Sequence, residues 1–150
     1  MGIMDKVKVY EHKAQYYETD QMGCVHHSNY IRWFEEARTE LLEQVGFSYK
    51  RMEEEGIMSP VLSVTAEYKS MVRYQDVVEI AIKVTSFNGI KFTMEYVVRD
   101  KETQVIRTTG RSEHCLLNLE CKPIRLMKVN KPIYDLFMEL SEAGWTSKDI

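Results

Sequence analysis

The feature that most constrains the fold is a segment, 29–45, in which apolar side chains recur with helical spacing. Placed at about 100° per residue, they cover roughly half of the helical wheel, which is wide for a surface helix. They are Tyr30, Ile31, Trp33, Phe34, Ala37, Leu41, Leu42 and Val45. A face of this width predicts a helix with a sheet wrapped around it. Ser28 is expected to cap its start and Gly46 to follow its end.

The rest of the chain is dominated by segments with the composition of strands. We expect strands at 6–17, 57–69, 77–86, 90–99 and 104–119. Asn88-Gly89 is a strong hairpin signal between the third and fourth of these. A short polar helix or turn near 48–55 and a last helix over 131–142, capped by Asn130, complete the set. Strands in succession with one segregated helix indicate an α+β fold with a five-stranded antiparallel sheet.

Alternation within the two central segments assigns one face of each strand to the core. The apolar positions are Val78, Ile80, Ile82 and Val84 in the first, and Ile90, Phe92, Met94, Tyr96 and Val98 in the second. The opposite face carries Ala81, Thr93 and Val97 and is therefore half apolar. Such a face, together with exposed strand edges, favours pairing between subunits.

Size and charge exclude several classes of protein. A chain of 150 residues suits a single domain, residues 1–150, with one core. The net charge of −3 disfavours partners bound by bulk electrostatics, so we expect no nucleic acid partner. No stretch is apolar enough to span a membrane, and the N-terminal residues lack the apolar run of a signal peptide. Three cysteines without a CxxC pair indicate reduced thiols and a cytoplasmic location.

The polar segment before the long helix is the best candidate for chemistry. Its carboxylate, Asp20, precedes a helix start, where free backbone N–H groups can hold an oxyanion. A carboxylate at that place could attack a thioester carbonyl or draw a proton from water. Gly23 allows a close approach of the backbone or a positive φ. From these residues alone, the favoured interpretation is structural: Asp20 forms an Asx turn or caps the loop, as a lone acidic residue in a polar loop more often does.

A run of matched positions then connects this segment to a known family. The stretch YYETDQMGCVHHSNYIRWFEEARTELL resembles the signature of the 4-hydroxybenzoyl-CoA thioesterase-like hotdog family. It is most similar to the branch of acyl-CoA thioesterases associated with the bacterial Tol–Pal gene cluster. The signature comprises an aromatic residue, an acidic–Thr–Asp triplet, Gly, a hydrophobic pair ending in His, and Asn-Tyr at the helix start. The resemblance covers roughly residues 7–127, and Cys24 stands where the family usually has an apolar residue.

The resemblance implies a hotdog fold and hydrolysis of acyl-CoA thioesters. It places the catalytic carboxylate on Asp20, as nucleophile or general base, and helper residues on Tyr16 and His27. The oxyanion donor would be a backbone N–H at His27 or close by. It implies no cofactor beyond the CoA of the substrate, and a homodimer or homotetramer with active sites at the subunit interface.

Two other functions are compatible with such a fold. The first is a non-catalytic hotdog module that binds acyl-CoA or a protein, for which a carboxylate at the position of Asp20 would be unnecessary. The second is a dehydratase acting on acyl-carrier protein, which is expected to use a different motif that we do not find. The identity of the acyl group cannot be read from the sequence.

Basic side chains are candidates for binding the phosphates of CoA. Lys69 and Arg73 flank aromatic residues in the segment YKSMVRY, which suits a nucleotide diphosphate and its base. Arg107 and Arg111 are further candidates. Taken singly, each of these four is better explained as a solvated charge at a strand edge.

Two further sets of residues have competing interpretations. His26 and His27 with Asp20 could suggest a metal, but neighbouring histidines point in different directions and no HxxxH spacing occurs, so we expect no metal site. Arg38 falls within the apolar arc of the long helix. It could pair with Glu35, or it could scaffold the site or an interface, and the family signature favours scaffolding.

Overall fold

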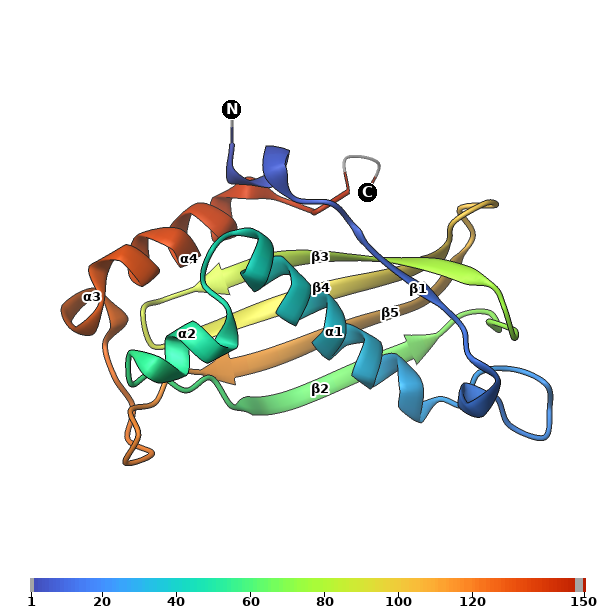
Figure 1. Ribbon diagram of the computed structural model, residues 1–150, viewed down its shortest axis with the longest axis horizontal. Coiled ribbons are helices and arrows are strands. Elements are labelled where there is room, and N and C mark those ends of the chain that lie inside the picture. The colour runs from blue at the N-terminus through green and yellow to red at the C-terminus, as the bar shows by residue number, and fades with distance from the viewer. Residues whose placement is uncertain (1, 148–149) are drawn as a thin grey trace.

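In the computed structural model, which describes residues 2–147 and 150, one antiparallel sheet wraps around one long helix (Figure 1). The strands are β1 (Tyr10–Lys13), β2 (Val61–Tyr68), β3 (Val77–Phe87), β4 (Lys91–Asp100) and β5 (Ile106–Cys115). Their order across the sheet is β1-β3-β4-β5-β2. The α+β prediction and the hotdog arrangement are therefore confirmed.

The long helix α1 (Ser28–Gln44) crosses the sheet diagonally, as Figure 1 shows. The predicted apolar face is buried from Tyr30 to Leu42, with the exception of Ile31, which is exposed. Gly46 follows the helix at φ +94°, as predicted. The prediction of Ser28 as N-cap is wrong: His27 occupies that position, and Ser28 is the first helical residue.

β3 and β4 supply the apolar part of the inner face of the sheet. All but one of the predicted apolar positions lie in the core at 0–2% exposure: Val78, Ile80, Ile82, Val84, Phe92, Met94, Tyr96 and Val98. The exception is Ile90, which precedes β4 and is only partly buried. The strands pair in register, with Ile80 opposite Val98 and Ile82 opposite Tyr96. Period-two alternation thus identified this face correctly.

Three strands are shorter than predicted, and β2 begins at Val61 rather than at 57. The first covers only Tyr10–Lys13 of the expected 6–17, because the chain leaves the sheet and forms a 3₁₀ turn, η2 (Tyr16–Glu18). The last ends at Cys115 rather than at 119, because Asn118 accepts hydrogen bonds from the backbone of Glu120 and Lys122 and turns the chain.

Short helices close the ends of the barrel-like core. They are η1 (Ile3–Lys6), α2 (Tyr49–Glu54), α3 (Leu126–Val129) and α4 (Lys131–Ala143). Asn130 caps α4 as predicted, since its Oδ1 accepts a hydrogen bond from the Ile133 N–H at 3.2 Å. The apolar face of α4 packs against β3. The helix α4 thereby covers the end of the core that lies away from the start of α1 (Figure 1).

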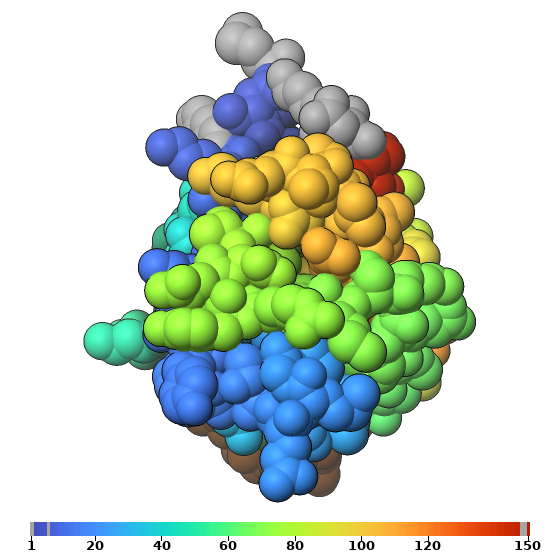
Figure 2. Space-filling model, turned by 90° about the vertical axis from the view of Figure 1, so that its right-hand side faces the viewer, coloured from blue at the N-terminus to red at the C-terminus, as the bar shows by residue number. Residues whose placement is uncertain are grey.

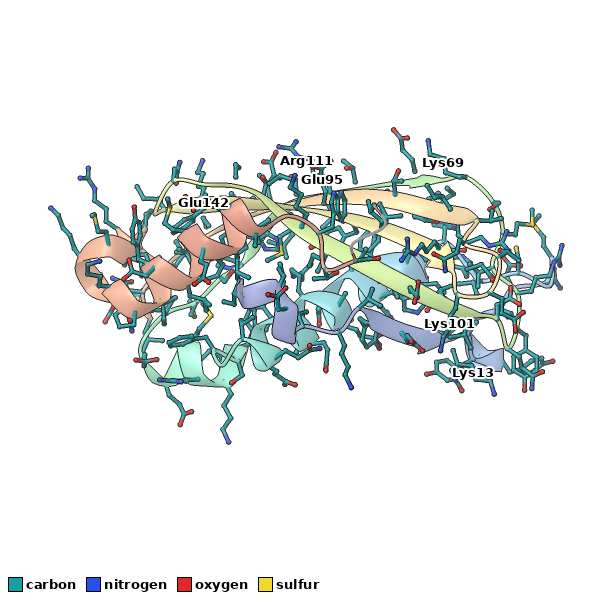
Figure 3. The ribbon with its side chains drawn as sticks, turned by 90° about the horizontal axis from the view of Figure 1, so that it is seen from above. Lys13, Lys69, Glu95, Lys101, Arg111 and Glu142 are labelled. Atoms are coloured by element: carbon teal, nitrogen blue, oxygen red, sulfur yellow. The ribbon has the colours of Figure 1, made fainter. Side chains whose placement is uncertain are left out.

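The outer face of the sheet is more polar and more covered than predicted. Figure 3 shows Glu95 and Arg111, which are opposite each other on β4 and β5, on the side remote from α1. Ala81 and Val97 are already buried within the protomer. The chain after α4 binds β3 here, where the Thr146 N–H donates to the Ile82 carbonyl at 2.9 Å. The edge strand β2, by contrast, exposes the apolar side chains of Val61, Leu62 and Tyr68.

No helix in the described part of the chain combines the length and the apolarity that crossing a bilayer requires.

Candidate active site

The segment that carries Asp20 folds into a tight turn at one end of the molecule. Thr19 and Val25 form an antiparallel bridge, and the Asp20 N–H donates to the Cys24 carbonyl at 2.9 Å. Gly23 sits within the turn at φ +78°, a conformation that favours glycine. Figure 2 shows this blue segment beside the yellow-green residues 69–76, which the Val25 N–H joins through the Val72 carbonyl.

The two oxygens of the Asp20 carboxylate have different surroundings. Oδ1 accepts the Met22 N–H at 2.8 Å and lies 3.7 Å from the Cys24 thiol sulfur, which can donate to it. Oδ2 accepts no hydrogen bond from the residues that the structure describes. Asp20 therefore forms the Asx turn that the structural interpretation predicts, and it keeps one oxygen free for chemistry.

Asp20 lines a pocket of about 370 Å³ between the start of α1 and the end of β2. The other lining residues are Cys24, Val25, His27, Tyr30, Tyr68, Lys69, Ser70 and Met71. The rings of Tyr30 and Tyr68 meet edge to face with centroids 5.2 Å apart. Burial raises the pKa of the Tyr30 phenol, which therefore stays protonated. A pocket that combines aromatic walls with polar side chains such as Asp20 and Lys69 suits a small organic group with polar substituents.

His27 brings a backbone donor to this pocket. It immediately precedes the first helical residue of α1, and its N–H donates no hydrogen bond within the described part of the chain. Its carbonyl accepts the Tyr68 hydroxyl at 3.0 Å, which ties the helix start to β2. The neighbouring N–H groups of Ser28 and Asn29 are both used, by the His26 ring and the His26 carbonyl. His27 therefore supplies an unpaired donor at the positive end of the helix dipole.

Tyr16 is not brought into the same pocket. Its side chain is 76% exposed, and its ring contacts the Tyr74 ring at 5.6 Å. Its carbonyl accepts the Thr19 hydroxyl at 2.7 Å, so the residue shapes the loop through its backbone. Its role as a helper residue at a subunit interface stays a prediction.

The four candidate cations lie in different settings. Lys69 lines the pocket and pairs with Glu67 at 2.9 Å, while Arg73 is exposed close to Gly23. Arg107 donates to Ser70 and faces Asp100, and Arg111 pairs with Glu113 at 3.3 Å. Of these four, Lys69 alone lines the pocket; Arg73 lies beside Gly23 of the turn, and Arg107 contacts the pocket wall through Ser70.

Other polar groups near the turn have defined partners. The His26 and His27 rings contact each other, with centroids 4.1 Å apart, and His26 Nδ1 bonds the Ser28 hydroxyl. Among the described residues, no group of three or more His, Cys, Asp or Glu side chains is arranged to hold a metal ion. Cys24 is buried, as expected from packing, but its thiol also contacts Asp20.

Sequence reasoning missed the long-range partners of the site. Tyr68 ends a strand some forty residues from His27, and no local pattern marks their contact. Arg38 does not pair with Glu35: it donates to the hydroxyls of Tyr96 at 3.0 Å and Tyr49 at 3.3 Å. It therefore scaffolds the core between α1, α2 and β4.

Comparison with known proteins identifies the family. Residues 15–135 match the model of the thioesterase-like superfamily. The acyl-CoA thioester hydrolase YbgC of Escherichia coli is 30% identical over 116 residues, which is 77% of this chain and 87% of that protein. The Tol–Pal branch indicated by the sequence signature is thus among the relatives.

Solved structures agree with this assignment. The DHNA-CoA thioesterase of Staphylococcus aureus superposes with a TM-score of 0.84 at 32% identity, covering 90% of this chain and 91% of that one. A protein of Aquifex aeolicus, AQ1494, superposes with a TM-score of 0.79 at 32% identity, covering 86% and 98%. The chain therefore belongs to the thioesterase-like superfamily of hotdog proteins.

Proposed function

We propose that the protein hydrolyses acyl-CoA thioesters, releasing a carboxylic acid and free CoA. The observation that carries the proposal is that Asp20, with a free Oδ2, and His27, with an unpaired N–H, line the same pocket. Relatives named acyl-CoA thioester hydrolase and DHNA-CoA thioesterase support it.

The reaction requires a carbonyl carbon to be attacked while negative charge develops on its oxygen. Asp20 either attacks that carbon itself, forming an anhydride that water then hydrolyses, or removes a proton from an attacking water. In both routes the C–S bond breaks and CoA leaves as a thiolate that takes up a proton. The carboxylate charge of Asp20 is needed in both.

The start of α1 stabilises the developing charge. The His27 N–H donates to the oxyanion, reinforced by the helix dipole, and such donors act most strongly where water is excluded. Tyr30 and Tyr68 pack against the acyl group. Lys69 and Arg73, on the segment beside the pocket, bind the phosphates of CoA.

Assembly completes the site. β2 is an edge strand, and Leu62 and Tyr68 on it are 50% and 48% exposed. A second copy that pairs there would cover these side chains and bring exposed residues such as Tyr16 to the neighbouring pocket. A homodimer, or a dimer of dimers, follows.

Asp20→Asn tests the proposal. Purified protein is assayed for thiol release from a panel of alkyl and aryl acyl-CoAs, and substrate binding is measured separately. We expect wild-type turnover, and in the variant a loss of about a hundredfold or more in kcat with binding retained. A folded Asp20→Asn protein with wild-type turnover would reject this mechanism, and a wild-type protein that binds acyl-CoA without hydrolysing it would favour a binding module.

A further inference from the structure

Glu18 is a buried carboxylate two residues before Asp20 that the mechanism above does not use. Its side chain is 5% exposed, and it ends the short turn η2. Burying a carboxylate costs free energy unless hydrogen bonds satisfy it. The hydrogen-bond partners of Glu18 therefore indicate its role.

The side chain of Glu18 joins three parts of the fold. Oε1 accepts the Gln15 N–H and lies 2.8 Å from His12 Nε2 on β1. Oε2 accepts the indole N–H of Trp33, on α1, at 2.8 Å. Burial by itself raises the pKa of Glu18, but the bonds from Gln15, His12 and Trp33 together hold it below its ordinary value. The carboxylate is therefore charged and fully engaged.

The backbone of Glu18 binds the opposite side of the catalytic turn. Its carbonyl accepts the His26 N–H at 2.8 Å and the Asn29 side-chain amide at 2.9 Å. His26 directly precedes His27, the proposed oxyanion donor. One residue thus fixes both the chain that leads into Asp20 and the chain that leads into His27.

We propose that Glu18 is a positioning residue that sets the separation between the Asp20 carboxylate and the His27 N–H by clamping both sides of the turn to Trp33 and His12. The inference rests on the proposed thioesterase function. Attack and oxyanion binding occur at the same carbonyl group, so a shift of about 1 Å between the two groups can cost up to about a hundredfold in rate.

The test compares Glu18→Gln with Tyr96→Phe. Glu18→Gln keeps the shape but replaces one accepting oxygen by an NH₂ group, which cannot accept from its donors. Tyr96→Phe also breaks a buried polar network, that of Arg38 and Ser112, but touches no residue of the turn. His12→Leu, which removes one donor at a mostly buried position, is the milder second variant.

The expected kinetic result is a selective loss of turnover. Glu18→Gln should lower kcat by roughly 10- to 100-fold, with KM changed less than about threefold, because the pocket walls remain. His12→Leu should show a smaller loss in the same direction, and Tyr96→Phe should retain wild-type kcat. In an Asp20→Asn background, Glu18→Gln should cost much less than in the wild-type background, because the separation that Glu18 sets matters only while the Asp20 carboxylate is present.

The reactivity of Cys24 reports whether the turn keeps its packing, independently of catalysis. In a Cys121→Ser background, the remaining thiols are Cys24, beside Asp20, and Cys115, at the end of β5, and both are buried. Modification by a thiol reagent, followed by peptide mapping, should show Cys24 reacting several-fold faster in Glu18→Gln with Cys115 unchanged.

The outcomes separate the two proposals. Wild-type kcat and unchanged Cys24 reactivity in Glu18→Gln would overturn the positioning role, as would equal acceleration at Cys24 and Cys115, which reports general destabilisation. A wild-type protein without thioesterase activity would overturn the proposed function instead.

Discussion

The ring of Phe34 lies against the backbone of Gly110, at the point where α1 crosses β5. A Cβ placed on Gly110 would overlap Phe34 Cε2 and Cζ and would lie 3.0 Å from the Thr65 carbonyl oxygen. Phe34 also stacks on Tyr96, with centroids 4.4 Å apart. The helix is therefore seated on the sheet through a position at which no side chain fits.

Gly110→Ala is expected to lower the free energy of unfolding by about 1–3 kcal/mol, because the added methyl group overpacks the helix–sheet contact. Urea denaturation monitored by circular dichroism measures the change. Gly2→Ala, where a Cβ meets no atom within 4 Å, is the matched control and should cost little. If Phe34→Leu in the Gly110→Ala protein gives no relief beyond additivity, the contact is not the cause.

The proposed catalytic roles predict a ranking of three variants. Asp20→Asn should cost most in kcat, because the charge acts at the reacting carbon. His27→Ala should cost less, because its backbone N–H survives the substitution. Tyr16→Phe should cost least, because its hydroxyl would support catalysis rather than perform it. Steady-state kinetics with one good acyl-CoA substrate establishes the order, and a larger loss for Tyr16→Phe than for His27→Ala would contradict the assignment.

Stability should depend on pH through His114. This imidazole is fully buried, and burial together with the nearby Arg38 charge lowers its pKa from 6.5 to about 3. Between these values the unfolded chain binds a proton that the folded chain does not, so the free energy of unfolding falls as pH falls, by up to about 1.4 kcal/mol per pH unit.

Urea unfolding of wild type and His114→Asn at pH 7, 6 and 5 isolates this contribution. This pH range lies above the ordinary pKa of a glutamate. Protonation of Glu18, whose pKa is lowered in the folded protein, would decrease stability further only at lower pH. The variant should be less stable overall and show a shallower decline. Equal slopes in the two proteins would mean that His114 does not control the decline.

Activity should be independent of metal, because the proposed chemistry uses water, a carboxylate and a backbone donor. Turnover is measured after prolonged dialysis against EDTA, with a zinc-dependent hydrolase treated in parallel to show that chelation succeeded. Loss of turnover that zinc restores would revive a metal site at His26 and His27.

Assembly should be symmetric, because the edge strand β2 exposes Val61, Leu62 and Tyr68. Light scattering across a dilution series should give a dimer or tetramer. Leu62→Lys, which places a charge on the exposed edge strand β2, should shift the equilibrium toward monomer. A dilute monomer with full activity would refute assembly as a requirement of the site.

Local sequence patterns predicted much of the fold because they report on single elements. Alternation identified every second residue from Val78 to Val84, and from Phe92 to Val98, as part of the core, since successive side chains of a strand face opposite sides of the sheet. Asn130 marked the start of α4, because its side chain accepts the N–H of Ile133 three residues later. Gly46 marked the end of α1, because it adopts a positive φ there. The motif around Asp20 and His27 located the candidate site, since both residues lie in one short segment.

The sequence by itself determined the strands, the long helix and the turn that carries Asp20, because each depends on residues close together in the chain. Only the tertiary structure decided which groups satisfy one another: Trp33 with the buried Glu18, Arg38 with Tyr96, and Tyr68 with His27. These pairs come from elements that meet only when the sheet closes around α1. The physical reason is that a buried donor must find an acceptor wherever packing places one, and neither periodicity nor composition encodes that place.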